Sequence, residues 1–123
     1  MKKTFFLSAI AMTLLACNSS NPLLDAPETP YGVPAFDQVK IEHYMPAFEA
    51  AITEQKAEID AIVNNPAEPT FDNTIVALDR TGMLLERVSG VFFNVLEADG
   101  NDEMNAIAEQ VSPLLSELND GII

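Results

Sequence analysis

The chain has 123 residues, one cysteine and a formal net charge of −13. This acidity excludes binding to nucleic acid, which requires clustered lysine and arginine side chains. A single cysteine excludes an internal disulfide, and a composition of 48% hydrophobic and 20% charged residues is typical of a globular domain.

Residues 1–16 have the pattern of a secretory signal peptide. Lys2 and Lys3 supply positive charge, and the mostly apolar stretch from Phe5 ends in the small residue Ala16. The stretch is too short to span a bilayer as a helix, which takes about 20 apolar residues. The pattern predicts that residues 1–16 direct export and are then removed.

Cys17 is predicted to carry a lipid. Together with the three residues before it, it forms Leu-Leu-Ala-Cys, which resembles the bacterial lipoprotein box, in which the cysteine is lipidated and becomes the first residue. The alternative is an ordinary signal peptide with an incidental cysteine near its cleavage site. Asn18 is not the aspartate that commonly retains lipoproteins on the inner membrane. We therefore expect an extracytoplasmic protein, lipid-anchored at a bacterial membrane in the periplasm or at the outer membrane.

Residues 17–36 are predicted to form a proline-rich tether. Its prolines are Pro22, Pro27, Pro30 and Pro34. Because proline removes a backbone donor and restricts the residue before it, this stretch is expected to be extended and to act as a spacer between membrane and domain. The apolar pair Leu23-Leu24 inside it is expected to contact the main body.

Residues 37–123 are predicted to be helical, with a first helix from about Glu42 to Val63. Its apolar stripe at helical spacing consists of Ile41, Tyr44, Phe48, Ala51, Ile52, Ile59, Ile62 and Val63. Pro46 is expected in the first helical turn, where a missing N–H is harmless. Asn64-Asn65-Pro66 is expected to stop the helix and to open a loop over residues 65–70.

A second helix is predicted after this loop, capped by Asp72 or Asn73. The residues of its apolar face, spaced three, four or seven apart, are Ile75, Leu78, Leu85, Val88, Phe92 and Leu96. Gly82 and Gly90 lie inside this pattern. Each costs a helix about 1 kcal/mol relative to alanine, which favours close packing of another helix at both positions.

The turn Asp99-Gly100-Asn101-Asp102 is predicted to end that helix and to cap a third one, which begins at Asp102 or Glu103. Its apolar residues are Ile107, Val111, Leu114, Leu115 and Leu118, and Pro113 interrupts its hydrogen-bond ladder. Successive helices joined by short loops predict an all-α fold of antiparallel helical hairpins.

Four segments, in order, cover much of the chain after residue 20. They read Asn-Pro-Leu-Leu (21–24), Pro-Tyr-Gly-Val-Pro-Ala-Phe-Asp (30–37), Val-Lys-Ile-Glu-His-Tyr-Met-Pro-Ala-Phe (39–48) and Asn-Pro-Ala-Glu-Pro-Thr-Phe-Asp-Asn-Thr-Ile-Val-Ala-Leu-Asp (65–79). Together they resemble the start of the thimet-oligopeptidase (M3) family of zinc metallopeptidases, in particular its bacterial peptidyl-dipeptidase branch. Ala35 departs from the pattern, since it stands where the family has a second proline.

The resemblance implies a nearly all-helical, two-lobed zinc oligopeptidase that cuts short peptides in a deep channel, and in this branch the product is a C-terminal dipeptide. The family holds its zinc on a His-Glu-x-x-His helix and a distant glutamate. The chain contains one histidine and no such motif. No catalytic or metal-binding residue is therefore assigned, and the fragment alone is predicted to be inactive.

Other polar and aromatic residues are interpreted as structural. His43 lacks a partner histidine or cysteine and is expected to serve the start of a helix. The acidic pairs Asp99/Asp102 and Glu58/Asp60 lack the alternating ligands of a calcium loop. The pair Phe92-Phe93 is expected to pack in the core.

The resemblance also implies that several hundred residues should follow Ile123, and that a histidine would be expected near Leu118. Marginal stability is expected for the isolated piece, with apolar surface left by Ile62, Val91, Phe93 and Val95. Two hypotheses remain. The chain is the N-terminal part of a lipoprotein-type zinc peptidase whose missing C-terminal region is catalytic, or it is a stand-alone acidic helical lipoprotein that binds a partner.

Overall fold

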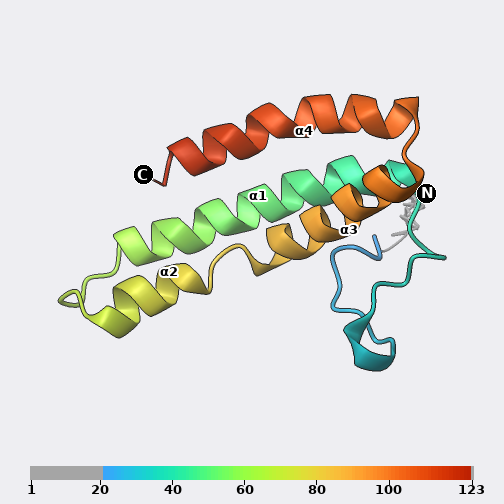
Figure 1. The fold of residues 1–123 in the computed structure, drawn as a ribbon. Helices are drawn as coiled ribbons and strands as arrows, with labels where there is room; N and C mark the ends of the chain where they lie inside the picture. Colours follow the sequence, from blue (N-terminus) through green and yellow to red (C-terminus); the bar gives the residue numbers. More distant parts are fainter. Residues whose placement is uncertain (1–20, 123) are drawn as a thin grey trace, which may run out of the picture.

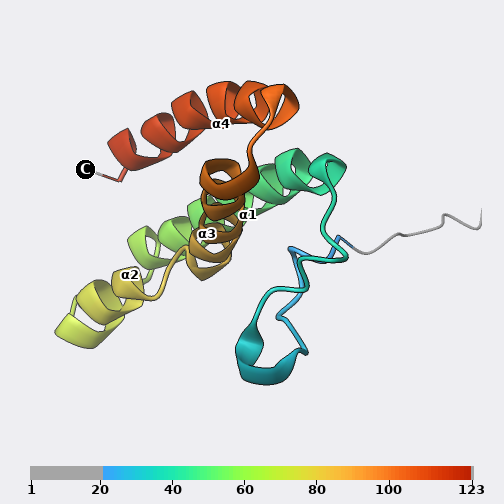
Figure 2. The same ribbon diagram turned by 45° about the vertical axis from the view of Figure 1, so that its right-hand side comes forward.

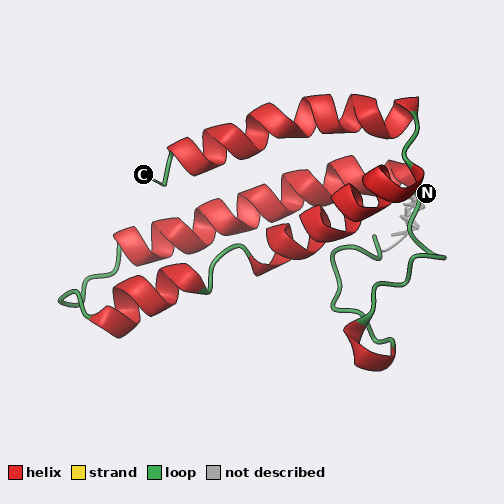
Figure 3. Cartoon of the chain, in the orientation of Figure 1, coloured by secondary structure: helices red, strands yellow, loops and turns green. Residues whose placement is uncertain are grey.

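A long central helix, α1 (Ile41–Val63), contacts both of the other long helices, α3 (Met83–Asp99) and α4 (Asp102–Asp120). The computed structural model describes residues 21–122. Figure 1 shows that α3 runs antiparallel to α1 and that α4 reverses direction again. Every regular element within the described residues is helical (Figure 3), which confirms the all-α prediction. None of the described helices is both long and apolar enough to cross a bilayer.

The start of α1 is fixed by a reciprocal pair of hydrogen bonds. The Lys40 N–H donates to Nδ1 of His43 (3.0 Å), and the His43 N–H donates to the Lys40 carbonyl oxygen (3.0 Å). The helix therefore begins at Ile41, and Pro46 lies inside it, not in the first turn as predicted. Its missing N–H leaves the Glu42 carbonyl without a helical partner, and this is tolerated because both residues are exposed to water.

The second predicted helix is broken into pieces. After the loop comes a π-helical turn, η2 (Phe71–Val76), then the short α2 (Ala77–Asp79), and α3 starts only at Met83. The cap is Thr70, whose hydroxyl accepts from the Asn73 N–H (3.1 Å), so the predicted caps Asp72 and Asn73 were wrong. The break falls at Gly82, which has φ 74° in the left-handed region that glycine adopts without strain.

Close packing was correctly predicted at only one of the two glycines. A Cβ built on Gly82 would lie 2.5 Å from the side chain of Gln55 on α1, whereas one built on Gly90 would meet nothing within 4 Å. The Gly82 N–H also donates to the Glu58 carboxylate (2.8 Å). Gly82 therefore brings the start of α3 against α1, and Gly90 is an ordinary exposed helical position.

The third predicted helix is confirmed as α4. Asn101 caps it, since its side-chain oxygen accepts from the Met104 N–H (3.0 Å). Val111 and Leu118 are buried as the apolar pattern indicates, and Pro113 lies on the exposed side. Met104, which the pattern omitted, is also buried.

The core centres on an aromatic cluster (Tyr44, Phe48, Phe92 and Phe93). Phe92 is fully buried and meets the rings of Tyr44, Phe48 and Phe93 edge to face, with centroids 5.0, 5.3 and 5.1 Å away. This geometry is the favoured one for aromatic pairs. The prediction that Phe92-Phe93 packs in the core is confirmed for Phe92, while Phe93 is half-buried.

The exposed apolar surface differs from the prediction. Val91 is 5% exposed and belongs to the core, and Ile62, Phe93 and Val95 are half-buried. The large exposed apolar side chains at the far end of the bundle are instead Val63, Phe71, Ile75, Leu78 and Met83. Ile75 and Leu78 were expected on the buried face, but the break at Gly82 separates their short helices from α3.

Residues 21–36 form a strap that is docked on the bundle. The predicted contact of the pair Leu23-Leu24 is confirmed for Leu23, which is 3% exposed in the core, but not for Leu24, which is 37% exposed. The Asn21 amide donates to the His43 carbonyl (2.8 Å), and the Arg87 guanidinium donates to the carbonyls of Leu24 (2.9 Å) and Leu23 (3.3 Å). The prolines predict an extended spacer between membrane and domain. The hydrogen bonds of Asn21 and Arg87 instead hold the strap on α1 and α3.

Burial raises the pKa of the Tyr44 phenol above its usual value of 10.0. The folded chain thus holds this proton more tightly than the unfolded chain, so the stability that Tyr44 contributes is constant below about pH 10 and falls as pH rises through the raised pKa. Tyr44→Phe is expected to reduce the alkaline loss of stability, measured as the free energy of unfolding against pH. Tyr31→Phe, which alters a fully exposed ring, is the matched control, and an equal effect of both substitutions would refute the assignment.

Candidate functional site

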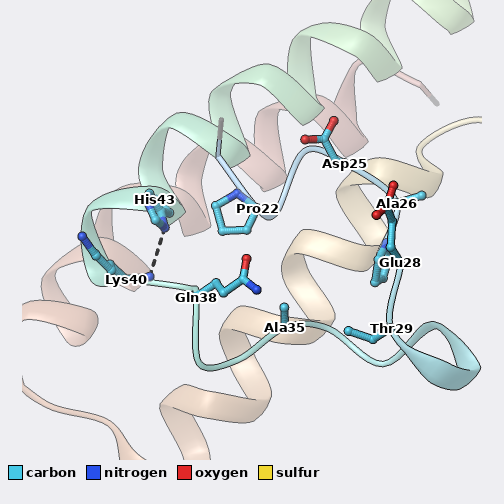
Figure 4. Close-up of a pocket in the computed structure, with 10 residues that line it drawn as sticks. Pro22, Asp25, Ala26, Glu28, Thr29, Ala35, Gln38, Lys40 and His43 are labelled. Carbon is cyan, nitrogen blue, oxygen red and sulfur yellow. Dashed lines mark hydrogen bonds between the residues drawn. The ribbon is translucent and has the colours of Figure 1, made fainter. Parts of the chain in front are cut away.

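One hollow lies between the strap and the start of α1. It has a volume of about 530 Å³ and is open to solvent. Figure 4 shows the strap residues that surround it together with Lys40 and His43 at the beginning of α1. Its ionisable groups are the carboxylates of Asp25 and Glu28, the Lys40 ammonium group and the His43 imidazole.

These groups do not form a catalytic arrangement. Nδ1 of His43 accepts the Lys40 N–H, so this ring nitrogen is committed to the start of α1, and the predicted helix-start role is confirmed. Lys40 pairs with Glu42 at 3.7 Å, but both side chains are 71% exposed and such pairs stabilise a protein little. No serine, cysteine or threonine nucleophile is hydrogen-bonded to His43 within the described part of the chain. The hollow can take up a small polar group but offers no nucleophile–base pair.

The described residues do not fit a zinc ion. Among residues 21–122, no three histidine, cysteine, aspartate or glutamate side chains gather closely enough to hold a metal. Zinc sites need three or four such ligands, and the described residues hold no second histidine and no cysteine to join His43. No chemical step through zinc is derived from this part of the chain.

The remaining candidates have separate places. Glu58 binds the Gly82 N–H and so caps the start of α3, while the carbonyl of Asp60 accepts from Asn64 at the end of α1. Asp99 and Asp102 flank the exposed turn between α3 and α4. Cys17, the predicted lipidation site, lies outside the described residues.

Two contacts that join separate parts of the bundle were not predicted from the sequence. Arg87 ties the strap to α3, and Glu58 caps α3 across the helix pair. Arg87 directly precedes the buried Val88 in the apolar stripe of α3. An arginine at the edge of an apolar stripe was the sequence signal that could have indicated a contact with another segment. The Glu58–Gly82 bond could not be read from the sequence, because it depends on where the second helix breaks.

Two further hollows lie along α4, with Leu118 between them. One, of about 370 Å³, is formed with α1 around Lys56 and Ile59, and the other, of about 360 Å³, with α1 and α3 around Gln55 and Leu85. Leu118 itself is buried. The family resemblance implied a histidine near this position, and the chain has a leucine there. Besides apolar residues, the first hollow is lined by Lys56, Asp60 and Glu117, and the second by Gln55, Glu86 and Ser89.

Comparison with known proteins relates the chain to peptidases. No protein-family model matches it. It is 46% identical to dipeptidyl carboxypeptidase of Salmonella typhimurium over 104 residues, or 85% of the chain, and 46% identical to dipeptidyl carboxypeptidase of Escherichia coli over 102 residues, or 83%. It is 29% identical to oligopeptidase A of Salmonella typhimurium over 98 residues, or 80% of the chain.

The similarity covers only a small part of those proteins. The chain spans about 15% of the length of the two dipeptidyl carboxypeptidases and about 14% of oligopeptidase A. It is thus homologous to the N-terminal part of these M3-type peptidases. The matched part corresponds here to a docked strap and a helical bundle without a catalytic arrangement among the described residues.

Proposed function

We propose that this chain is the N-terminal part of a zinc-dependent M3 oligopeptidase that hydrolyses short peptides and releases dipeptides from their carboxyl ends. The observation that carries the proposal is the 46% identity to two dipeptidyl carboxypeptidases over more than four fifths of the chain. The lower identity to oligopeptidase A favours dipeptide release over internal cleavage.

The part played by these residues is that of a scaffold. Phe92 and its aromatic neighbours fix α1 against α3, and the strap adds Leu23 to the same core. Zinc supplies a Lewis acid and an activated water in such enzymes, and the residues that hold it belong, under this proposal, to a C-terminal region that follows the chain. Peptide substrates are bound by the complete protein.

We also propose that Cys17 is lipidated and that the protein is extracytoplasmic at a bacterial membrane. Its support is the Leu-Leu-Ala-Cys sequence after an apolar stretch and the absence of any other cysteine. Cys17→Ser is expected to move the protein from the membrane fraction to the soluble fraction and to abolish incorporation of labelled fatty acid. Asn18→Ser is the matched control. Fatty-acid labelling that survives Cys17→Ser would refute the assignment.

The activity is tested on the longest product expressed from the natural gene. We expect release of C-terminal dipeptides from short peptides with a free carboxyl end, loss of this activity with a metal chelator, and its return with added zinc. The same peptides with an amidated carboxyl end are the control, since an enzyme that recognises the terminal carboxylate should cleave them poorly.

Different outcomes separate the alternatives. Chelator-sensitive cleavage at internal bonds of both free and amidated peptides would show an oligopeptidase without dipeptide specificity. A product that ends at Ile123 and lacks activity would overturn the peptidase proposal and favour the stand-alone binding lipoprotein, whose partner would meet the exposed apolar side chains around Phe71 and Met83.

A further inference from the structure

The docked strap begins almost directly after the residue that would carry the lipid. Only residues 18–20 separate Cys17 from Asn21. An extended chain spans at most about 3.6 Å per residue, so a linker of three residues is a short connection. Asn21 is fixed to α1 through the His43 carbonyl. A lipid on Cys17 would therefore hold the folded body close to the bilayer and not on a long spacer.

The strap carries several large apolar side chains that are exposed to solvent. The strap patch consists of Leu24, Tyr31, Val33 and Phe36, which are 37%, 103%, 49% and 50% exposed. Figures 1 and 2 show the strap as a loop on the side of the bundle opposite α4, with the η1 turn (Pro30–Gly32) at its tip. The patch lies away from α4 and on the segment that leads to the anchor.

The backbone holds Tyr31 out at the tip of this loop. Tyr31 has φ 64°, in the left-handed region that residues with a side chain rarely adopt, and the Thr29 hydroxyl donates to the Val33 carbonyl across the turn. The turn therefore leaves the Tyr31 ring fully exposed at the tip of the strap. Tyrosine is among the residues enriched where proteins meet the membrane interface.

Charge indicates which lipid surface fits the patch. Residues 21–40 contain the three carboxylates of Asp25, Glu28 and Asp37 and one lysine, Lys40, and the Arg87 guanidinium is bonded to carbonyls of the strap. An anionic lipid surface would repel this segment, because binding to such lipids requires basic side chains. Apolar side chains next to a covalent anchor match the interface of a zwitterionic bilayer instead.

We propose that the strap patch is the membrane-facing surface of this protein and rests in the interface of a zwitterionic bilayer. The inference rests on the lipid anchor proposed above. The short connection to Cys17 brings the patch to the lipid, docking by Leu23 and Arg87 fixes the orientation of the bundle, and α4 faces away from the membrane.

The test uses the complete lipidated protein in vesicles of phosphatidylcholine and phosphatidylethanolamine. An environment-sensitive fluorescent amino acid replaces Tyr31 in one variant and Asn105, exposed on α4, in a matched control. Lipids that carry a quencher near the headgroup are expected to remove most of the fluorescence at position 31 and little at position 105. Replacing part of the phosphatidylcholine with phosphatidylglycerol is expected to weaken the quenching at position 31.

A third variant isolates the role of the short connection. A flexible Gly/Ser segment inserted between residues 20 and 21 keeps the lipid and the strap but frees the body from the surface. Quenching at position 31 is expected to fall to the level seen at position 105, and undiminished quenching would overturn the linker argument.

Sedimentation and quenching together distinguish a missing lipid anchor from a strap patch that does not face the membrane. If the wild-type protein does not sediment with the vesicles, the lipid anchor is refuted and the inference falls with it. If it sediments but position 31 is not quenched, the anchor stands and the membrane-facing patch is refuted. A position 31 shielded from both lipid and aqueous quenchers would show that another part of the polypeptide covers the patch.

Discussion

Phe92→Ala is expected to lower the free energy of unfolding by about 3–5 kcal/mol, the usual cost of deleting a buried phenylalanine ring. Phe92 is fully buried and touches the rings of Tyr44 and Phe48 on α1 and of Phe93 on its own helix. Its removal leaves a cavity at the contact between α1 and α3. A small domain has about 5–15 kcal/mol in total, so this loss removes a large share of the stability of the isolated chain.

The measurement is urea unfolding of the chain, followed by far-UV circular dichroism. Phe71→Ala is the matched control, because Phe71 is 70% exposed and its removal should change stability by no more than about 0.5 kcal/mol. Equal losses in the two variants would contradict the position of the core.

Gly82→Ala and Gly90→Ala are expected to change stability in opposite directions. At Gly82 the backbone has φ 74°, where a side chain costs roughly 1–2 kcal/mol, and the added Cβ would also displace the Gln55 side chain. At Gly90 the added Cβ meets nothing within 4 Å, and alanine in an exposed helix stabilises by about 0.5–1 kcal/mol.

Thermal unfolding of both variants checks this pair, with Gly82→Asn as a further comparison. Asparagine tolerates the left-handed region better than alanine, so Gly82→Asn should recover part of the loss. If Gly82→Ala were as stable as Gly90→Ala, residues 77–99 would form one continuous helix and the break at Gly82 would be refuted.

Helical spacing predicted the main elements well because the apolar stripes of α1, α3 and α4 are long. Phe48, Val88, Phe92 and Val111 are fully buried as their spacing indicates. Asn101 was recognised as part of a cap because a polar residue after glycine and before a helical pattern has few other roles. These features depend on local sequence alone.

The errors arise where tertiary contacts decide. The pattern from Ile75 to Leu96 could be written as one helix, but the Glu58 carboxylate and the close approach of Gln55 stabilise a turn at Gly82. Val91 was expected at the surface because it lies outside the apolar stripe of α3. The sequence does not show that the strap packs beside this part of the helix. Proline content predicted a spacer with one docking contact at Leu23-Leu24, whereas burial of Leu23 and the hydrogen bonds from Arg87 hold residues 21–36 on the bundle.

The sequence predicted only those features of the candidate site that depend on residues close together in the chain. His43 was correctly interpreted as a helix-start residue, since a histidine without a second one in the sequence is a weak metal signal. The open hollow beside it depends on how the strap folds back over α1, which no motif specifies. Lipidation of Cys17 remains a prediction.

The length of the polypeptide made from the natural gene is the most direct test of whether these residues begin a larger peptidase. Mass spectrometry of the purified natural product should find a chain of several hundred residues in which this sequence forms the N-terminal part, with a His-Glu-x-x-His motif further along. A product that ends at Ile123 would contradict the proposal and leave a helical lipoprotein without peptidase chemistry.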